Sequence, residues 1–219
     1  FIKVADLRYG ENPHQQAAWY RDLYPAVGSL ASAKQYQGKE LSYNNIGDAD
    51  AAWECVRQFD ETACAIIKHA NPCGVAVAAS PAEAYDLAFA TDPTSAFGGI
   101  IAMNGVVEAT AARELTSLFL ECVVAPGFTP EAREVLAAKA NLRLLELAPQ
   151  AIDAAGPDHV RSILGGLLVQ DLDDQAITPA DWTVASQRPP TPQEKQDLEF
   201  AWRLVRHVRS NAIVVARDG

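Results

Sequence analysis

Ala65-Ile66-Ile67-Lys68-His69-Ala70-Asn71-Pro72-Cys73-Gly74 is an apolar run that ends in a lysine and a histidine and then enters a turn. An apolar run bounded by turn residues predicts a buried strand. Ligands of open α/β sheets bind beyond the carboxyl ends of strands. Side chains alternate between the two faces of a strand, but we expect the Asn71-Pro72 turn to break the alternation and bring Lys68 and His69 to one ligand. The alternative is a lysine that extends to solvent and a histidine that caps the turn.

Apolar runs alternate with helix-like segments along the rest of the chain, which predicts an α/β layer fold. Strands are expected at Ala63–Lys68, Gly74–Val77, Gly99–Met103, Cys122–Ala125, Leu142–Leu147, Leu167–Gln170, Thr183–Ser186 and Ala212–Ala216. A strand followed at once by Arg217-Asp218-Gly219 also suggests a piece of a longer protein.

Helix starts are marked by a hydroxyl residue followed by proline, at Ser80-Pro81, Thr129-Pro130 and Thr191-Pro192. A further helix is expected over Asp48–Phe59. In the helix that opens at Thr191, a buried stripe is predicted, made of Leu198, Ala201, Val205 and Val208. The segment Ile152–Ser162 is expected to be a loop or a poorly formed connection.

The 219 residues can bury one full core, or two small ones that share a sheet. A formal charge of −10 argues against a nucleic-acid-binding surface, although local basic groups can still bind one small phosphorylated ligand. The four cysteines form no Cys-x-x-Cys pair, which is typical of cytosolic proteins. No stretch approaches ~20 apolar residues, so no membrane span is predicted. We therefore expect a cytoplasmic location.

Three further clusters are rich in polar and turn-forming residues: Leu7–Gln15, Lys39–Asp48 and Thr91–Gly99. The first offers an arginine suited to phosphate and a tyrosine suited to a heterocycle or a ribose, although an ordinary polar segment explains it as well. The second is explained by turns and capping alone. The third contains paired glycines that allow a ligand near the backbone, and a plain loop is an equal alternative.

The segment around His69 also resembles part of a zinc-deaminase signature, His-x-Glu followed by Pro-Cys-x-x-Cys. Asn71 stands where the general acid/base glutamate is needed, and Ala76 stands in place of the second cysteine. Zinc-dependent deamination is therefore not expected.

A closer resemblance is carried by seven collinear runs: LRYGENPHQ, GKELSYNNIGDADAAW, AIIKHANPCGVA, TDPTSAFGGIIA, VVAPGF, GGLLVQD and VRSNAIVVA. They resemble the formyltransferase domain of the bifunctional purine biosynthesis family, which formylates aminoimidazole carboxamide ribonucleotide (AICAR) and also has IMP cyclohydrolase activity. The resemblance implies a cytidine-deaminase-like α/β fold, with a mixed sheet flanked by helices and no zinc. It implies that residues 1–219 are the first, nucleotide-binding part of that domain, without the cyclohydrolase domain and the C-terminal folate-contacting part.

The same resemblance implies a catalytic pair, Lys68 and His69. It implies substrate-binding residues as well: Arg8, Tyr9, Gly98, Glu121 and Asn211. Glu121 stands where some family members carry aspartate. The implied partners are AICAR, 10-formyltetrahydrofolate as formyl donor, and a second copy of the chain, with active sites at the interface of a homodimer.

The implied reaction transfers a formyl group to the 5-amino group of AICAR, a poor nucleophile because its lone pair is delocalised. A histidine titrates near neutral pH, so His69 is the candidate base that takes the amine proton. Lys68 is suited to stabilise the oxyanion or to protonate the departing folate nitrogen. Two alternatives stay open: a non-catalytic purine-nucleotide-binding or dimerisation module, and a deaminase-like hydrolase.

Overall fold

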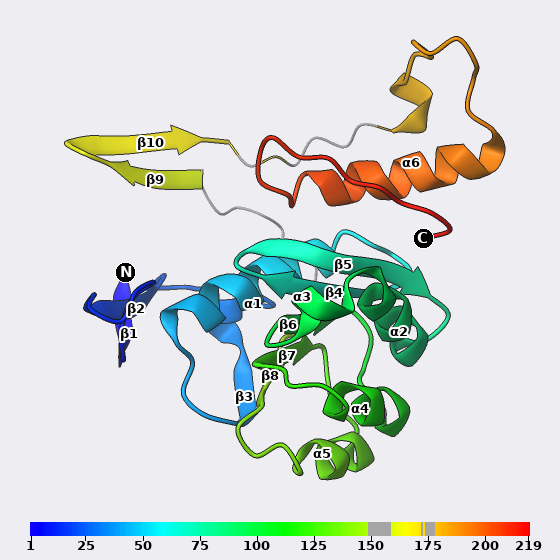
Figure 1. Ribbon diagram of the computed structural model, residues 1–219. Helices are drawn as coiled ribbons and strands as arrows, with labels where there is room; N and C mark the ends of the chain where they lie inside the picture. Colours follow the sequence, from blue (N-terminus) through cyan, green and yellow to red (C-terminus); the bar gives the residue numbers. More distant parts are fainter. Residues whose placement is uncertain (149–158, 172, 174–177) are drawn as a thin grey trace.

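The computed structural model describes residues 1–148, 159–171, 173 and 178–219. A mixed sheet with the strand order β3-β8-β7-β6-β4-β5 forms its centre (Figure 1). Its strands are β3 (Lys34–Gln37), β4 (Thr62–Lys68), β5 (Asn71–Ala78), β6 (Ile100–Met103), β7 (Cys122–Ala125) and β8 (Arg143–Glu146). The predicted α/β class, with a mixed sheet between helices, is confirmed.

The direction of the strands explains where polar residues gather. β6, β7 and β8 are parallel to one another, whereas β4 runs antiparallel to β6, and β3 runs antiparallel to β8. The carboxyl ends of β3 and β4 therefore lie at the same edge of the sheet as the amino ends of β6, β7 and β8. Residues that follow β3 and β4 meet residues that precede the three parallel strands.

Two apolar clusters cover the two faces of this sheet, and neighbouring residues of one strand belong to different clusters. In β4, Cys64 and Ile66 belong to one cluster, whereas Ala65 and Ile67 belong to the other. This alternation is what a strand buried on both faces requires. The continuous apolar runs of the sequence predicted these strands because both of their faces are buried.

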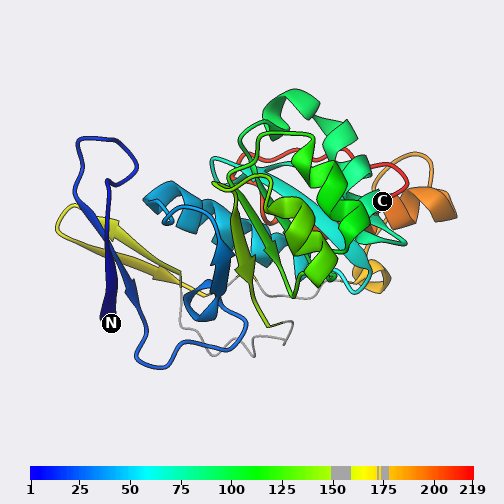
Figure 2. The ribbon, with the colours of Figure 1, turned by 90° about the horizontal axis from the view of Figure 1, so that it is seen from below.

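The helices lie in two layers (Figures 1 and 2). α1 (Tyr43–Val56) packs on β4, β6 and β7. The opposite face is covered by α2 (Pro81–Thr91), α4 (Ala109–Thr116) and α5 (Pro130–Leu136), whose buried residues belong to the cluster of Ile66. α3 (Pro93–Ala96) is a single turn before β6.

The predicted helix starts are confirmed. The Thr129 hydroxyl accepts a hydrogen bond from the N–H of Ala132, and the Ser80 hydroxyl accepts one from Glu83. α6 (Pro192–Val205) begins with a full capping box between Thr191 and Glu194. The helix predicted over Asp48–Phe59 begins five residues earlier, because Ser42 and Asn45 form a capping box of their own.

Two hairpins stand away from the central sheet (Figure 2). One consists of β1 (Ile2–Leu7) and β2 (Ala17–Arg21), and the other of β9 (His159–Ile163) and β10 (Gly166–Gln170). The turn-rich segment after Leu7 joins β1 to β2. The sequence predicted β10 but missed β1, β2 and β9. Most of the expected connection Ile152–Ser162 lies outside the described residues, and its end belongs to β9.

Two predicted strands, Thr183–Ser186 and Ala212–Ala216, are wrong, because neither segment is assigned as a strand. Apolar residues alone do not make a strand without a neighbouring strand to bond with. The segment Leu30–Ser32 forms a short 3-10 helix, as does Pro179–Asp181. None of the described helices is both long enough and apolar enough to cross a membrane.

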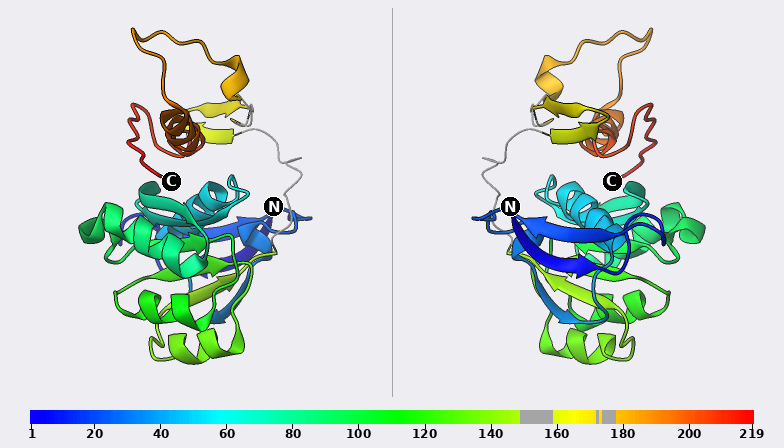
Figure 3. Two further views of the ribbon diagram at one scale, coloured as in Figure 1. Left: turned by 90° about the vertical axis from the view of Figure 1, so that its right-hand side faces the viewer. Right: turned by 90° about the vertical axis from the view of Figure 1, so that its left-hand side faces the viewer.

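α6 and the C-terminal residues lie beyond the β5 side of the sheet (Figure 3). The predicted buried stripe of α6 is wrong, because Leu198 is 48% exposed and Ala201, Val205 and Val208 are only half-buried. Leu204 is the buried residue of this helix, and the Phe200 ring lies 5.3 Å from the ring of Phe59. The helix therefore packs on the segment that follows α1, through a different face from the predicted one.

Candidate functional site

The turn between β4 and β5 consists of His69 and Ala70. Lys68 pairs with Asn71 in the ladder, so only two residues connect the strands, and both have positive φ angles of 54° and 57°. A two-residue hairpin loop with two positive φ angles is the type I′ turn. The turn predicted at Asn71-Pro72 thus lies two residues earlier. Pro72 is tolerated inside β5 because β5 is an edge strand.

The carboxylate of Asp48, on α1, binds the backbone of this turn. The N–H of Ala70 donates to Oδ1 of Asp48 at 2.8 Å, and the N–H of His69 donates to Oδ2 at 3.3 Å. On the other side, the Asn71 side chain donates to the carbonyl of His69 at 3.1 Å. The backbone that carries the His69 side chain is therefore fixed by two side chains.

Lys68 is fixed by the loop before β6. Its Nζ donates to the carbonyl of Phe97 at 2.9 Å. The next residue, Gly98, has a φ of 72°, a conformation that favours glycine, and its N–H donates to the carbonyl of Phe119 at 2.8 Å. The Phe97 and Phe119 rings lie 5.3 Å apart. The Lys68 ammonium thus lies beside a loop whose own shape depends on Gly98.

Arg143, the first residue of β8, connects several of the segments that line the site. Nη1 donates to Oε2 of Glu121 at 2.6 Å, and Nε donates to the carbonyl of Glu40 at 3.0 Å. The Arg143 side chain is 11% exposed, and that of Glu121 is 35% exposed. Such a charge-assisted hydrogen bond is strong in a partly buried position. It links the segment after β3 to the residues before β7 and β8.

Thiols beside the site are not activated. Burial raises the pKa of Cys122, the neighbour of Glu121. Burial also raises the pKa of Cys73 in β5, with a smaller contribution from the Asp92 charge. Because the thiolate is the nucleophile, both groups are unsuited to nucleophilic catalysis at neutral pH. Hydrogen bonds from Ser95 lower the pKa of Asp92, which keeps its charge and caps α3.

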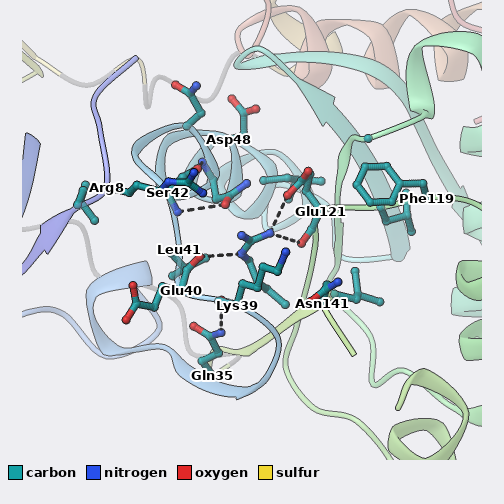
Figure 4. Close-up of a pocket in the computed structure, with 18 of the residues that line it drawn as sticks. Arg8, Gln35, Lys39, Glu40, Leu41, Ser42, Asp48, Phe119, Glu121 and Asn141 are labelled. Atoms are coloured by element: carbon teal, nitrogen blue, oxygen red, sulfur yellow. Dashed lines mark hydrogen bonds and ion pairs between the residues drawn. The ribbon is translucent and has the colours of Figure 1, made fainter. Parts of the chain in front are cut away.

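One open cleft of about 1230 Å³ is lined by Asp48, Lys68, His69, Glu121 and Arg143, among other residues. In Figure 4, Arg8 and Phe119 lie on opposite sides of the view, with Lys39, Glu121 and Asn141 between them. The lining includes five cationic side chains, Arg8, Lys39, Lys68, Lys139 and Arg143, and four acidic ones, Asp6, Glu40, Asp48 and Glu121. The cleft thus has one more cationic than acidic side chain, in a chain whose formal net charge is −10. Local cationic groups of this kind can bind an anionic ligand.

The cleft brings together six of the seven residues that the sequence singled out: Arg8, Tyr9, Lys68, His69, Gly98 and Glu121. Among the described residues, Asn211 is not one of those that line this cleft. It lies in the loop after α6, which contacts the β4–β5 hairpin where the N–H of Arg209 donates to Oδ1 of Asn71 at 3.3 Å. Arg8 also lies 5.7 Å from the ring of its neighbour Tyr9.

Sequence reasoning missed part of the site. Turns and caps explain the segment Lys39–Asp48 in the sequence, yet in the structure it provides both the cap of α1 and one wall of the cleft. The sequence predicts only a strand around Arg143 and no role for its side chain. A single arginine in the apolar run Leu142–Leu147 was a usable signal, because a charged side chain is rarely buried without a partner. Among the described residues, no group of three or more His, Cys, Asp or Glu side chains could hold a metal ion.

Comparison with known proteins identifies the family of this chain. The model of the AICARFT/IMPCHase bienzyme family matches residues 1–219. The chain belongs to this family. It is 74% identical over 223 residues to the bifunctional purine biosynthesis protein PurH of Synechococcus sp. (strain CC9605), covering 97% of this chain and 42% of the relative.

Two further relatives show similar coverage. PurH of Parasynechococcus marenigrum (strain WH8102) is 68% identical over 219 residues, with 97% of this chain and 42% of the relative covered. PurH of Prochlorococcus marinus (strain MIT 9303) is 64% identical, with 97% and 43% covered. The chain spans about two fifths of the length of these curated relatives.

Proposed function

We propose that this chain takes part in transfer of a formyl group from 10-formyltetrahydrofolate to the 5-amino group of AICAR, in a protein that also has IMP cyclohydrolase activity. One observation carries the proposal: Lys68 and His69 lie at a rigid strand end and line one cleft with Arg8 and Tyr9, in a member of the AICARFT/IMPCHase family. Residues 1–219 then form the first, nucleotide-binding part of the formyltransferase domain.

His69 acts as the general base in this proposal. The amine of AICAR conjugates with its ring, so its proton must leave as the nitrogen attacks the formyl carbon. An imidazole held at the reacting nitrogen provides roughly 100- to 10,000-fold by general base catalysis. Support comes from the turn, where hydrogen bonds to Asp48 and Asn71 fix the backbone of His69. The remaining acceleration comes from positioning.

Lys68 stabilises negative charge that develops on the formyl oxygen. Its Nζ donates one hydrogen bond to the Phe97 carbonyl, which orients the ammonium and leaves two N–H groups for ligands. A cation that is oriented before the reaction lowers the barrier without reorganisation. The same ammonium is suited to protonate the departing folate nitrogen.

The nucleotide is held by the substrate-binding residues Arg8, Tyr9, Gly98, Glu121 and Asn211. Arg8 is suited to bind the phosphate through its planar guanidinium, and Tyr9 offers a ring and a hydroxyl. Gly98 brings backbone close to the ligand. Arg143 binds Oε2 of Glu121, which orients the carboxylate toward ribose or carboxamide donors. Asn211 reaches the ligand only if the loop after α6 contributes to the site.

The folate supplies the formyl group. Ligand pockets usually measure about 300–1,000 Å³, so a cleft of about 1230 Å³ has room for a nucleotide and part of a second reactant. Lys39 and Lys139, which line it as well, suit an anionic co-substrate. These features support the fit of a formyl-folate.

A homodimer with active sites at the subunit interface is part of the proposal. Both hairpins that stand away from the sheet expose large apolar side chains. Examples are Val160 at 57%, Leu167 at 62% and Tyr20 at 53% exposure. Exposed apolar surface of this kind favours a protein partner. We also assign the mixed sheet to the cytidine-deaminase-like fold, which the strand order and the two helix layers support.

The test compares His69→Ala, Lys68→Met and Arg8→Gln in the full-length protein that the gene encodes. Steady-state formyl transfer and calorimetric AICAR binding are measured for each variant. We expect His69→Ala and Lys68→Met to lower kcat by roughly 100-fold or more with little change in AICAR affinity, and Arg8→Gln to weaken AICAR binding. Lys195→Met, on the exposed side of α6, is the control for the lysine variant.

Normal turnover by His69→Ala contradicts the assignment of the base. AICAR binding by the wild type without any formyl transfer favours a non-catalytic nucleotide-binding module. Stoichiometric zinc in a metal analysis of the purified protein, together with deaminase activity, favours the deaminase-like hydrolase.

A further inference from the structure

We infer that Asp48 is a positioning residue for formyl transfer, because its carboxylate holds the His69–Ala70 turn in a backbone conformation that these two residues disfavour. The inference rests on the proposed function, in which the His69 imidazole takes the amine proton. The sequence placed Asp48 in a capping segment, but Oδ1 of its side chain lies 2.8 Å from the backbone nitrogen of Ala70 in the turn.

The turn itself is the first observation. A type I′ turn needs positive φ angles at both central positions, and Asn-Gly is the preferred pair. Here the pair is His69-Ala70, at φ 54° and 57°. A side chain with a Cβ crowds the following carbonyl oxygen in this conformation. Two adjacent residues of this type keep the conformation only where their surroundings stabilise it.

Asp48 provides that stabilisation. Its two oxygens accept one hydrogen bond each, from the N–H of Ala70 at 2.8 Å and from the N–H of His69 at 3.3 Å. Both donors are the amides of the two left-handed residues. A charged acceptor makes these hydrogen bonds stronger than those between neutral groups. The carboxylate therefore favours the one arrangement in which both amides point toward α1.

α1 makes Asp48 a fixed point rather than a mobile side chain. The helix is anchored by the capping box of Ser42 and Asn45, and it packs on β4, the strand that leads into the turn. Ala49 and Ala52 of the same helix are fully buried against the sheet. The position of the imidazole therefore depends on the packing of α1 on β4, transmitted through one carboxylate.

Lys68 and His69 are held in place by different groups. Lys68, before the turn, is held by the Phe97 carbonyl, which Asp48 does not contact. Loss of the Asp48 carboxylate should thus displace His69 more than Lys68. A displacement of about 1 Å can lower a rate by roughly 100-fold while the ligand stays bound. The expected signature is a loss in kcat with little change in KM.

The experiment uses the full-length protein with Asp48→Ala, Asp48→Asn, and Asp48→Ala combined with Ala70→Gly. Asp48→Asn keeps one acceptor and should fall between the wild type and Asp48→Ala. We expect Asp48→Ala to lower kcat for formyl transfer by roughly 10- to 100-fold and to change KM for AICAR by less than about threefold. Adding Ala70→Gly should restore at least about fivefold, because glycine adopts positive φ without crowding. The single variant Ala70→Gly is the reference for the combined one.

Rescue by Ala70→Gly is the outcome that a direct contact between Asp48 and substrate cannot give. If the combined variant is as slow as Asp48→Ala, or if Asp48→Ala keeps its kcat within about twofold of the wild type, the positioning role is wrong.

Hydrogen exchange of the Ala70 amide tests the hydrogen bond without any assay of turnover. We expect exchange at Ala70 to be faster in Asp48→Ala, with unchanged exchange in β6 and β7 as evidence that the sheet is intact. A wild-type protein that transfers no formyl group contradicts the proposed function. In that case, equal Ala70 exchange in the wild type and Asp48→Ala contradicts the inference separately.

Discussion

Arg143 and Glu121 form a partly buried ion pair at the side of the sheet where β3 and β4 end and β6, β7 and β8 begin, with Nη1 of Arg143 at 2.6 Å from Oε2 of Glu121. Arg143 also donates to the carbonyls of Glu40 and Glu121. The guanidinium thus connects the segment after β3 with the residues before β7. The pair holds two walls of the cleft at a fixed separation.

Replacing Glu121 by glutamine should lower the free energy of unfolding by about 1–3 kcal/mol, because a buried guanidinium loses its charged partner. Urea unfolding at neutral pH measures the change. Glu134→Gln, at an exposed position of α5, is the control and should change stability by less than about 0.5 kcal/mol. Equal stabilities of the two variants would show that the ion pair contributes nothing to the fold.

Gly38 sets the close approach between the end of β3 and the start of β8. A Cβ at this position would lie 2.5 Å from the carbonyl oxygen of Leu142 and 2.7 Å from the backbone nitrogen of Arg143, and φ is +97°. We therefore expect Gly38→Ala to lower the free energy of unfolding by at least about 2 kcal/mol, and to disturb the Arg143 ion pair.

Gly47→Ala is the matched control for Gly38→Ala. Gly47 lies inside α1, and a Cβ added there would meet nothing within 4 Å outside its own helix and chain neighbours. Alanine at this position should therefore raise stability by up to about 1 kcal/mol through helix propensity. Thermal unfolding of both variants should give Tm shifts of opposite sign. Shifts of the same sign would contradict the close approach at Gly38.

The sequence predicted the central strands well because their signal is local. β4, β6 and β7 are apolar runs buried on both faces, and hydrophobicity alone marks them. β3 was missed because Lys34–Gln37 is polar and gains its place only by pairing with β8. Ala212–Ala216 is the opposite case, because this segment is apolar but does not form a strand. Pairing depends on distant segments, which a local pattern does not report.

The candidate site could be predicted to the same extent. Lys68 and His69 stand at the end of an apolar run, so the pattern singled them out as candidates. Asp48 acts across 22 residues of sequence on Ala70, and Arg143 acts across 22 residues on Glu121. Nothing in the sequence near either residue indicates these partners. These contacts depend on the direction of the strands. Because β4 runs antiparallel to β6, the end of β4 lies at the same side of the sheet as the starts of β6, β7 and β8.

The face of α6 gives a direct test of one incorrect expectation. Phe200→Ala should lower the free energy of unfolding by about 2–4 kcal/mol, because the ring packs on Phe59, which is 6% exposed. Leu198→Ala, in the predicted stripe, should cost less than about 1 kcal/mol, because that side chain is 48% exposed. Urea unfolding of the two variants separates the two faces, and a larger loss for Leu198→Ala would favour the stripe predicted from sequence.

His207, just after α6, should make stability depend on pH. Burial, with a smaller contribution from the Arg206 charge, lowers the pKa of His207 from 6.5 to about 4. The unfolded chain then binds a proton at a higher pH than the folded chain. The stabilisation by neutral His207 is therefore fully present above pH 6.5 and is lost as the pH falls toward about 4.

The measurement is urea unfolding of the wild type and His207→Leu at a series of pH values above and below 6.5. Leucine does not titrate, so the difference in unfolding free energy between the two proteins should change by up to about 1.4 kcal/mol for each pH unit below 6.5. A loss of stability in His207→Leu that is the same at every pH reflects packing alone and gives no support to the titration of His207. The buried neutral imidazole is tested only by the slope of this free-energy difference against pH. A slope of zero between pH 6.5 and about 4 would mean that His207 binds its proton equally well in the folded and the unfolded chain.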